Sequence, residues 1–451
     1  MSSATTISEI IATARSQQAA RIKIAAQIQE FPEALFELAG HLEILDLADN
    51  QLSQLPQAFG RFKKLRILFL SNNQFQHIPA VLANCPALEM IAFKNNRISE
   101  FAEDVLPETT RWLILTNNQI RVLPQSMGKL HRLQKLALGG NQIQQLPDSM
   151  QACKNLELAR LSANQLPSLP NWLLQLPKLS WLAFAGNAMP QSSTDSSVPL
   201  VSLADIHLGK KIGEGASGLI YKARWADSSP YKTPAEIAVK LFKGAITSDG
   251  YPQDELHCCL KAGKQPHLIK VLAQIDEDDQ LGMVMELIPS DYSNLGLPPS
   301  LASCTRDTFP AGTHVCLSDI VKISYQMAQT LEHLHQQKIS HGDIYAHNTM
   351  INASATTLFG DFGAASDLTL LPIEQQSAMQ KIELRALGCC IEDLISTCSD
   401  TQQASPLGQA LQQVKDQCMQ AKPILRPSFT ELLQRLEAIS ELTTARPLDK
   451  L

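Results

Sequence analysis

Disulfide, membrane and secretion signals are missing from this 451-residue sequence. Its ten cysteines form no C-x-x-C pair, and four of them lie in adjacent positions, Cys258-Cys259 and Cys389-Cys390. This arrangement favours reduced thiols over a disulfide framework. No run of about 18 apolar residues predicts a membrane span, and the polar N-terminus lacks the basic and then apolar layout of a signal peptide. We therefore expect a cytoplasmic protein without a membrane span.

The sequence also lacks an excess of basic over acidic residues. The net charge of −6 argues against nucleic acid as a partner, because phosphate backbones are bound by positively charged faces. Apolar residues at 44% and charged residues at 18% are typical of a globular protein. A chain of this length has room for two or three domains, each with its own core.

Asparagine recurs at a nearly constant interval in the first part of the chain. An L-x-x-L-x-L-x-x-N pattern ends at Asn50, with Leu42, Leu45 and Leu47 before it, and it returns before the later asparagines with other residues at some leucine positions. A weaker unit at residues 22–24 starts the series. This repeat is typical of a leucine-rich-repeat solenoid, which we place at residues 21–189 behind an N-terminal helical cap at residues 1–20. The positions are Asn50, Asn73, Asn96, Asn118, Asn141, Asn164 and Asn187, in steps of 23, 23, 22, 23, 23 and 23 residues.

The other face of each short strand is expected to line the concave surface of the solenoid, because side chains alternate along a strand. Aromatic and Met side chains on that surface favour protein binding. The alternative is that some of them pack on the second domain or on the N-terminal helix. The predicted concave residues include Ile44, Asp46, Ile67, Phe69, Met90, Ala92, Trp112, Ile114, Lys135, Arg160, Trp181 and Ala183.

A linker rich in Ser and Pro is predicted at residues 190–203, and the repeat stops there. Apolar residues then alternate on both sides of Gly213, Gly215 and Gly218, which predicts strand, glycine turn and strand. Glycines let backbone amides approach a phosphate. A dinucleotide-binding site would need a helix next, and the sequence predicts a strand instead.

A lysine and an acidic helix follow the glycine turn. Lys240 lies in a short β-like run at residues 236–241, and residues 252–262 have a helical pattern. Glu255 on this helix is placed to pair with Lys240, although Asp254 and Asp249 remain alternatives. The apolar run at residues 283–287 predicts a further strand that leads into a hinge. Residues 290–316 are irregular and form either a solvated insertion or a substrate-contacting flap.

Two short loops further along carry acidic and amide side chains. Asp343 and Asn348 lie five residues apart in the sequence His341-Gly342-Asp343-Ile344-Tyr345-Ala346-His347-Asn348. Asp361 follows in Gly360-Asp361-Phe362-Gly363. Carboxylate and amide oxygens of this kind suit Mg²⁺, which completes its shell with phosphate and water.

In this order, the motifs resemble those of the protein-kinase family over residues 204–440, with a tail at residues 441–451. The resemblance implies a multidomain fold: an α/β leucine-rich-repeat solenoid followed by a bilobal α+β kinase fold. It also implies ATP and Mg²⁺ as cofactors. The implied catalytic residues are Asp343, Lys240 and Asn348, the implied metal ligands are Asn348 and Asp361, and the implied nucleotide contacts are Ile212, Gly213, Gly215, Gly218, Ile220, Ala238, Lys240, Glu255, Met285, Glu286 and Ile288.

Four features depart from the family pattern. Gly342 replaces the Arg that senses activation-loop phosphate, and Tyr345 replaces the Lys that helps to neutralise the transferred phosphate in Ser/Thr kinases. His347 would supply part of that charge if it were protonated. No A-P-E motif is visible, so Glu374 is the nearby candidate acid for Arg426. The segment between residues 361 and 383 is short.

The resemblance identifies the chain as an intracellular leucine-rich-repeat protein kinase. The expected reaction is transfer of the ATP γ-phosphate to a protein hydroxyl, Ser or Thr by default, while the concave surface binds a protein partner or substrate. One alternative is a pseudokinase-like scaffold that binds nucleotide without useful turnover and acts through its repeats. A small-molecule kinase is a further alternative, and the oligomeric state stays open.

Overall fold

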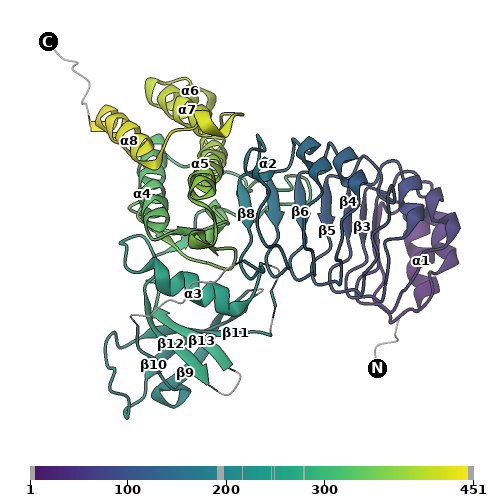
Figure 1. Ribbon diagram of the computed structural model, residues 1–451, viewed down its shortest axis with the longest axis horizontal. Coiled ribbons are helices and arrows are strands. Elements are labelled where there is room, and N and C mark those ends of the chain that lie inside the picture. The colour runs from purple at the N-terminus through teal and green to yellow at the C-terminus, as the bar shows by residue number, and fades with distance from the viewer. Residues whose placement is uncertain are drawn as a thin grey trace. The chain divides into compact units, whose positions relative to one another are not determined.

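The computed structural model describes residues 6–189, 198–215, 217–244, 246–247, 249–277 and 280–444 (Figure 1). It divides into two compact units, Met1–Leu176 and Pro177–Leu451. Most of the predicted linker and of the predicted tail lies outside the described residues, as do the first five residues of the predicted cap. The strand at Trp181–Ala183, which the repeat pattern assigns to the solenoid, belongs to the second unit.

Short parallel strands follow one another in chain order in the first unit, as Figure 1 shows. Their central residues are in register, so that Leu45 lies opposite Leu68 and Leu68 opposite Ile91. These side chains are fully buried. The strands are β1 (Arg21–Lys23), β2 (Ile44–Asp46), β3 (Ile67–Phe69), β4 (Met90–Ala92), β5 (Trp112–Ile114), β6 (Lys135–Ala137) and β7 (Leu158–Arg160).

The convex segments begin at prolines, because a fixed φ and a missing amide suit the position before a helical turn. Most are 3₁₀ turns rather than α-helices. They are η1 (Glu33–Leu38), η2 (Gln57–Arg61), η3 (Ala80–Asn84), η4 (Gln125–Lys129), η5 (Asp148–Ala152) and the helix α2 (Asn171–Leu174). Helix α1 (Ile7–Ser16) buries Ile11 and Ala14 and pairs with η1 through Arg15 and Glu37, whose side-chain atoms lie 2.6 Å apart.

The repeated asparagines hold neighbouring turns together. Asn73 Nδ2 donates to the carbonyls of Leu47 at 2.9 Å and Leu70 at 3.1 Å, and its Oδ1 accepts from the Leu52 amide at 2.9 Å. Asn96, Asn118, Asn141 and Asn164 repeat this arrangement. Each asparagine therefore satisfies three backbone groups that the turn would otherwise bury without partners.

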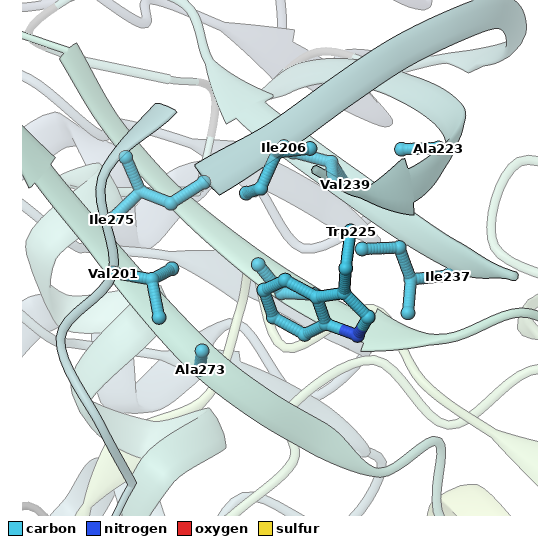
Figure 2. Close-up of a cluster of buried hydrophobic side chains, with 9 residues drawn as sticks. Val201, Ile206, Ala223, Trp225, Ile237, Val239, Ala273 and Ile275 are labelled. Atoms are coloured by element: carbon cyan, nitrogen blue, oxygen red, sulfur yellow. The ribbon is translucent and has the colours of Figure 1, made fainter. Parts of the chain in front are cut away.

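A five-stranded antiparallel sheet forms one lobe of the second unit, in the order β12-β13-β11-β10-β9. Figure 2 shows Trp225 among Val201, Ile237 and Ala273 in the apolar core of this lobe. Helix α3 contacts β13. The elements are η6 (Leu203–Asp205), β9 (Ile206–Glu214), β10 (Gly218–Trp225), β11 (Ile237–Phe242), α3 (Pro252–Ala262), β12 (Val271–Glu277) and β13 (Gln280–Glu286).

The other lobe is mainly helical, and strand β8 (Trp181–Ala183) lies beside its helix α5 (Figure 1). Its helices are α4 (Leu317–Gln336), α5 (Ile373–Ile395), α6 (Asp400–Gln403), α7 (Pro406–Cys418) and α8 (Phe429–Thr444). Short elements connect them: β14 (Ser293–Asn294), β15 (Ile339–Ser340), η7 (Ala346–Asn348), β16 (Thr349–Ile351), β17 (Thr357–Phe359), β18 (Ser366–Asp367), η8 (Leu368–Leu370) and η9 (Pro423–Leu425). The predicted fold class, a repeat solenoid followed by a bilobal α+β fold, is therefore confirmed.

Among the helices of the described residues, none is long and apolar enough to cross a membrane. All ten cysteines lie in this part of the chain and are free thiols, and Cys316 alone is exposed.

The irregular segment at residues 290–316 is anchored on the helical lobe rather than solvated along its whole length. Arg306 forms ion pairs with Glu392 at 2.7 Å and Asp393 at 2.6 Å on α5. Thr305 and Asp307 beside it are buried. This anchoring fixes the segment next to the loop that carries Asp343.

The prediction that Glu374 is the partner of Arg426 is wrong. Glu374 is exposed on α5, whereas the buried Arg426 guanidinium donates to three backbone carbonyls. These belong to Gln420 at 2.9 Å, Lys381 at 2.8 Å and Pro177 at 2.8 Å. Burial, together with the nearby charge of Arg385, lowers the pKa of Arg426 to about 10. The carbonyls accept the hydrogen bonds that a carboxylate would otherwise accept.

Candidate active site

Lys240 and Glu255 form the ion pair that the sequence predicts. Lys240 extends from β11 and Glu255 from α3, and their side chains are only 9% and 2% exposed. Among the described residues, Glu255 is the candidate acid that pairs with Lys240, rather than Asp254 or Asp249. Although burial alone would lower the pKa of the Lys240 ammonium, the carboxylates of Glu255 and Asp361 raise it above its ordinary value. Lys240 is therefore held as a cation.

The loop that carries Asp343 is fixed from several sides. Asn348 Nδ2 donates to Asp343 Oδ2 at 2.7 Å and to the Asp343 carbonyl at 3.1 Å. The Gly342 amide donates to Glu383 Oε1 at 2.7 Å, and Glu383 is 1% exposed on α5. His341 Nε2 lies 2.9 Å from the Gly360 carbonyl, which ties this loop to the loop of Asp361. The base candidate and the metal-ligand candidates are thus positioned by one hydrogen-bond network.

Asp361 has a φ of +58°, a conformation that costs a non-glycine residue about 1–3 kcal/mol and that is concentrated at functional sites. Asp361 is exposed, and its Oδ1 lies 3.4 Å from the Gly363 amide. The turn aims an accessible carboxylate toward the cavity that Lys240 and Asn348 also line.

One cavity of about 350 Å³ brings most of the predicted site together. Its volume falls within the range of small-molecule sites. Its lining combines apolar side chains such as Leu268, Val271, Met283 and Met350 with the charged groups of Lys240, Glu255 and Asp361. This combination fits a flat base together with phosphates and a cation. The predicted residues on its wall are Gly215, Gly218, Ile220, Lys240, Glu255, Met285, Ile288, Asn348 and Asp361.

Gly218 shows why the glycine turn requires glycine. A Cβ at this position would lie 2.7 Å from the Leu241 carbonyl and 3.2 Å from the Lys240 side chain. A larger residue would therefore displace the strand that carries Lys240.

Five predicted site residues do not line this cavity. Ile212 is 50% exposed on β9, Gly213 lies opposite Ile220 in the sheet, and Ala238 is buried. Glu286 is exposed and pairs with Lys270 at 2.8 Å. Asp343 reaches the site through its hydrogen bond with Asn348. The sequence pattern of a strand predicts which side chains lie on the same face of the sheet. It does not show which of the two faces lies over a ligand.

Asp307 is a site-forming residue that the sequence did not reveal. Its fully buried carboxylate accepts from the Ala346 amide at 2.6 Å and lies 2.6 Å from His347 Nδ1. The irregular segment that carries it has no periodic pattern, so no sequence signal connects it to this loop. His347, which lines the cavity, is therefore paired with a carboxylate.

Trp181 is not a concave anchor for a partner. It is 1% exposed, and its ring stacks on Tyr345 with centroids 4.6 Å apart and planes 5° apart. The alternative interpretation, packing on the second domain, is confirmed for this residue. Ala183 is also fully buried.

The fold and this site define a protein-kinase domain. Residues 206–402 match the family described as protein tyrosine and serine/threonine kinase. Residues 27–75, 40–98 and 108–166 match the leucine rich repeat family. The chain therefore joins leucine-rich repeats to a protein-kinase domain.

Curated proteins that match part of the chain include two fibroblast growth factor receptors. Fibroblast growth factor receptor 1 of Pleurodeles waltl is 25% identical over 169 residues, which are 36% of this chain and 21% of that protein. Fibroblast growth factor receptor 1 of Xenopus laevis is 26% identical over 173 residues, again 36% and 21%. The chain spans about a fifth of the length of these relatives.

Proposed function

We propose that this chain is an ATP-dependent protein kinase that phosphorylates a hydroxyl group of a protein. The observation that carries the proposal is the convergence of Lys240, Asn348 and Asp361 on one cavity, with Asn348 hydrogen-bonded to Asp343. Phosphoryl transfer needs positioning and charge stabilisation more than covalent chemistry, and these groups supply both.

Each residue has a role that its surroundings support. Lys240, oriented by Glu255, would bind the phosphates of the nucleotide, and Asn348 and Asp361 would hold Mg²⁺. Asp343 would orient the acceptor hydroxyl and take its proton. ATP supplies the transferred phosphoryl group, and Mg²⁺ neutralises its charge. Met285 and Ile288 would contact the base, since both lie on the cavity wall.

The acceptor and the partner belong to this proposal as well. Serine or threonine is our default acceptor. The matching family includes kinases for tyrosine as well as kinases for serine and threonine. The repeats would bind the substrate or another protein. The partly exposed side chains Ile44, Ile67, Phe69, Trp112 and Ile114 on β2, β3 and β5 support this, because an aromatic anchor such as Trp112 often carries much of the binding energy of an interface. A cytoplasmic location agrees with ten free thiols.

Transfer of labelled phosphate from Mg-ATP tests the proposal. Wild-type protein is expected to label itself or a general protein substrate. Asp343→Asn and Lys240→Met should lose nearly all transfer, whereas the control variants Asp319→Asn, at a partly exposed position, and Lys264→Met, at an exposed one, should keep it. Equal labelling by the wild type and both site variants would show that another activity produces the signal.

A nucleotide-binding scaffold without turnover is the second candidate. Tyr345 favours it, because this 4%-exposed ring occupies the position of the lysine in Ser/Thr kinases and brings no cation. The scaffold hypothesis expects Mg-ATP to raise the melting temperature through Lys240 while no phosphate is transferred to any of a broad panel of proteins. Transfer that Asp343→Asn abolishes would exclude it.

A further inference from the structure

Trp181 on the last repeat strand contacts the loop that carries Asp343. Trp181 Nε1 donates to the Ile344 carbonyl at 2.9 Å, and Ile344 directly follows Asp343. The Trp181 ring covers Tyr345, the next residue, in an almost parallel stack. Both Trp181 and Ile344 are 1% exposed. Two consecutive residues after Asp343 are therefore held by one side chain from β8.

Gly342 lets the same strand approach the residue before Asp343. It has a φ of +73°, and a Cβ there would lie 3.0 Å from the Leu182 carbonyl and 2.5 Å from the Ala364 carbonyl. The positive φ would strain any other residue, and its Cβ would press on the Ala364 carbonyl and on β8. Glycine is thus required by this φ and by the Ala364 carbonyl, and the Leu182 carbonyl of β8 adds a further close contact.

Other contacts keep β8 in place within the second unit. The Phe184 amide donates to Ser366 Oγ at 3.1 Å. Arg385 Nε donates to the Lys178 carbonyl at 3.1 Å, and Arg426 donates to the Pro177 carbonyl at 2.8 Å. These contacts are made to three separate segments of the helical lobe. Strand β8 is therefore fixed at both ends and cannot shift without breaking buried hydrogen bonds.

We infer that Trp181 is a positioning residue for the phosphoryl-transfer reaction: strand β8 holds the loop of Asp343 in its working geometry. The effect of Trp181 on catalysis rests on the proposed kinase function. Trp181 does not line the cavity, so it would act through the Ile344 carbonyl and the Tyr345 ring rather than on the nucleotide. Loss of this contact should lower kcat and leave the KM for ATP unchanged.

The test uses the full chain with Trp181→Ala, Trp181→Phe and the control Trp172→Ala. Trp172 belongs to the first unit and donates to Asp148 at 3.0 Å. We expect Trp181→Ala to lower kcat by roughly 10- to 100-fold, the cost of a small displacement of reacting groups. Trp181→Phe keeps the stack but loses the donor, so a decrease of roughly fivefold is expected. Trp172→Ala should keep the wild-type kcat.

Hydrogen exchange supplies a readout that does not depend on activity. The amides of Gly342, Ala346 and Asn348 are hydrogen-bonded in this loop. The peptide covering residues 341–348 should exchange roughly tenfold faster in Trp181→Ala, while the β11 peptide covering residues 237–242 keeps its rate.

The outcomes separate the two proposals. Faster exchange at residues 341–348 together with a lower kcat supports positioning by Trp181. Faster exchange in a chain whose wild type transfers no phosphate supports the contact and overturns the kinase proposal. Wild-type exchange and wild-type kcat in both Trp181 variants overturn the positioning role. If Trp181→Ala does not fold, the same two measurements on Trp181→Phe decide the question.

Discussion

Glu383→Ala should strongly destabilise the second unit. Glu383 is 1% exposed, accepts from the Gly342 amide at 2.7 Å and lies 2.6 Å from His335 Nε2. Alanine removes the carboxylate from both of these buried contacts, at a cost of about 1–3 kcal/mol each. The expected loss in the free energy of unfolding is therefore about 2–6 kcal/mol, a large share of the stability of an ordinary domain.

Two companion variants make this prediction specific. Glu383→Gln keeps the shape and removes the charge, so about 1–2 kcal/mol should be lost because charge-assisted hydrogen bonds are stronger than neutral ones. In a double-mutant cycle with His335→Gln, the coupling energy should reach about 1 kcal/mol or more. Glu374→Gln is the control on the same helix. Glu374 is exposed, so its effect should stay within about 0.5 kcal/mol.

Urea unfolding measures these differences, and hydrogen exchange of α5 peptides assigns them to the second unit. The kinase reaction gives a second readout, because loss of the hydrogen bond from the Gly342 amide to Glu383 loosens the loop of Asp343 and should lower kcat more than it changes the KM for ATP. A Glu383→Ala protein as stable as Glu374→Gln, or a coupling energy near zero with His335, would refute the reasoning.

Three further predictions concern other parts of the chain. Asn118→Ala should lower the free energy of unfolding of the first unit by about 2–3 kcal/mol in urea titrations, because three backbone groups lose their partner. An unchanged urea midpoint would contradict this stabilising role of the repeated asparagines. Arg426→Met should cost the second unit at least about 3 kcal/mol by the same method, because three carbonyls lose a charged donor, and a neutral effect would argue against it. Burial raises the pKa of Asp254 from 3.8 to about 6, so the folded state binds its proton more tightly and stability falls as pH rises from about 4 to 6. Asp254→Asn should therefore stabilise the chain at pH 7.5 by at most about 3 kcal/mol and have no such effect near pH 4; an equal gain at both pH values would contradict this cause.

The repeats could be predicted from the sequence because the spacing of the repeated residues and their chemical types indicate the same structure. A step of 23 residues with leucine at alternating positions sets the strand register, and the asparagines occupy the turns as expected. The pairing of Lys240 with Glu255 was expected from the resemblance to protein kinases. The helical pattern alone does not choose Glu255, because Asp254 lies on the same helix.

Contacts between segments that are distant in the chain could not be predicted. The strand register correctly placed Trp181 on the face away from the leucines, but it does not show what covers that face. Arg426 was expected to bind an acid, whereas carbonyls from three segments surround it. Asp307 lies in a segment with no periodicity, so its contact with Ala346 depends on how the lobe folds.

The most direct test of the central claim is intact-mass and peptide mass spectrometry of the purified full chain after incubation with Mg-ATP. We predict phosphate on protein hydroxyl groups with the wild type and with Asp319→Asn, and none with Asp343→Asn. The modified residues would also show whether the acceptor is serine, threonine or tyrosine. Phosphate incorporation that is the same in Asp343→Asn as in the wild type, or a folded wild type that binds nucleotide but phosphorylates neither itself nor added proteins, would contradict the assignment of Asp343 and its loop as a working phosphoryl-transfer site.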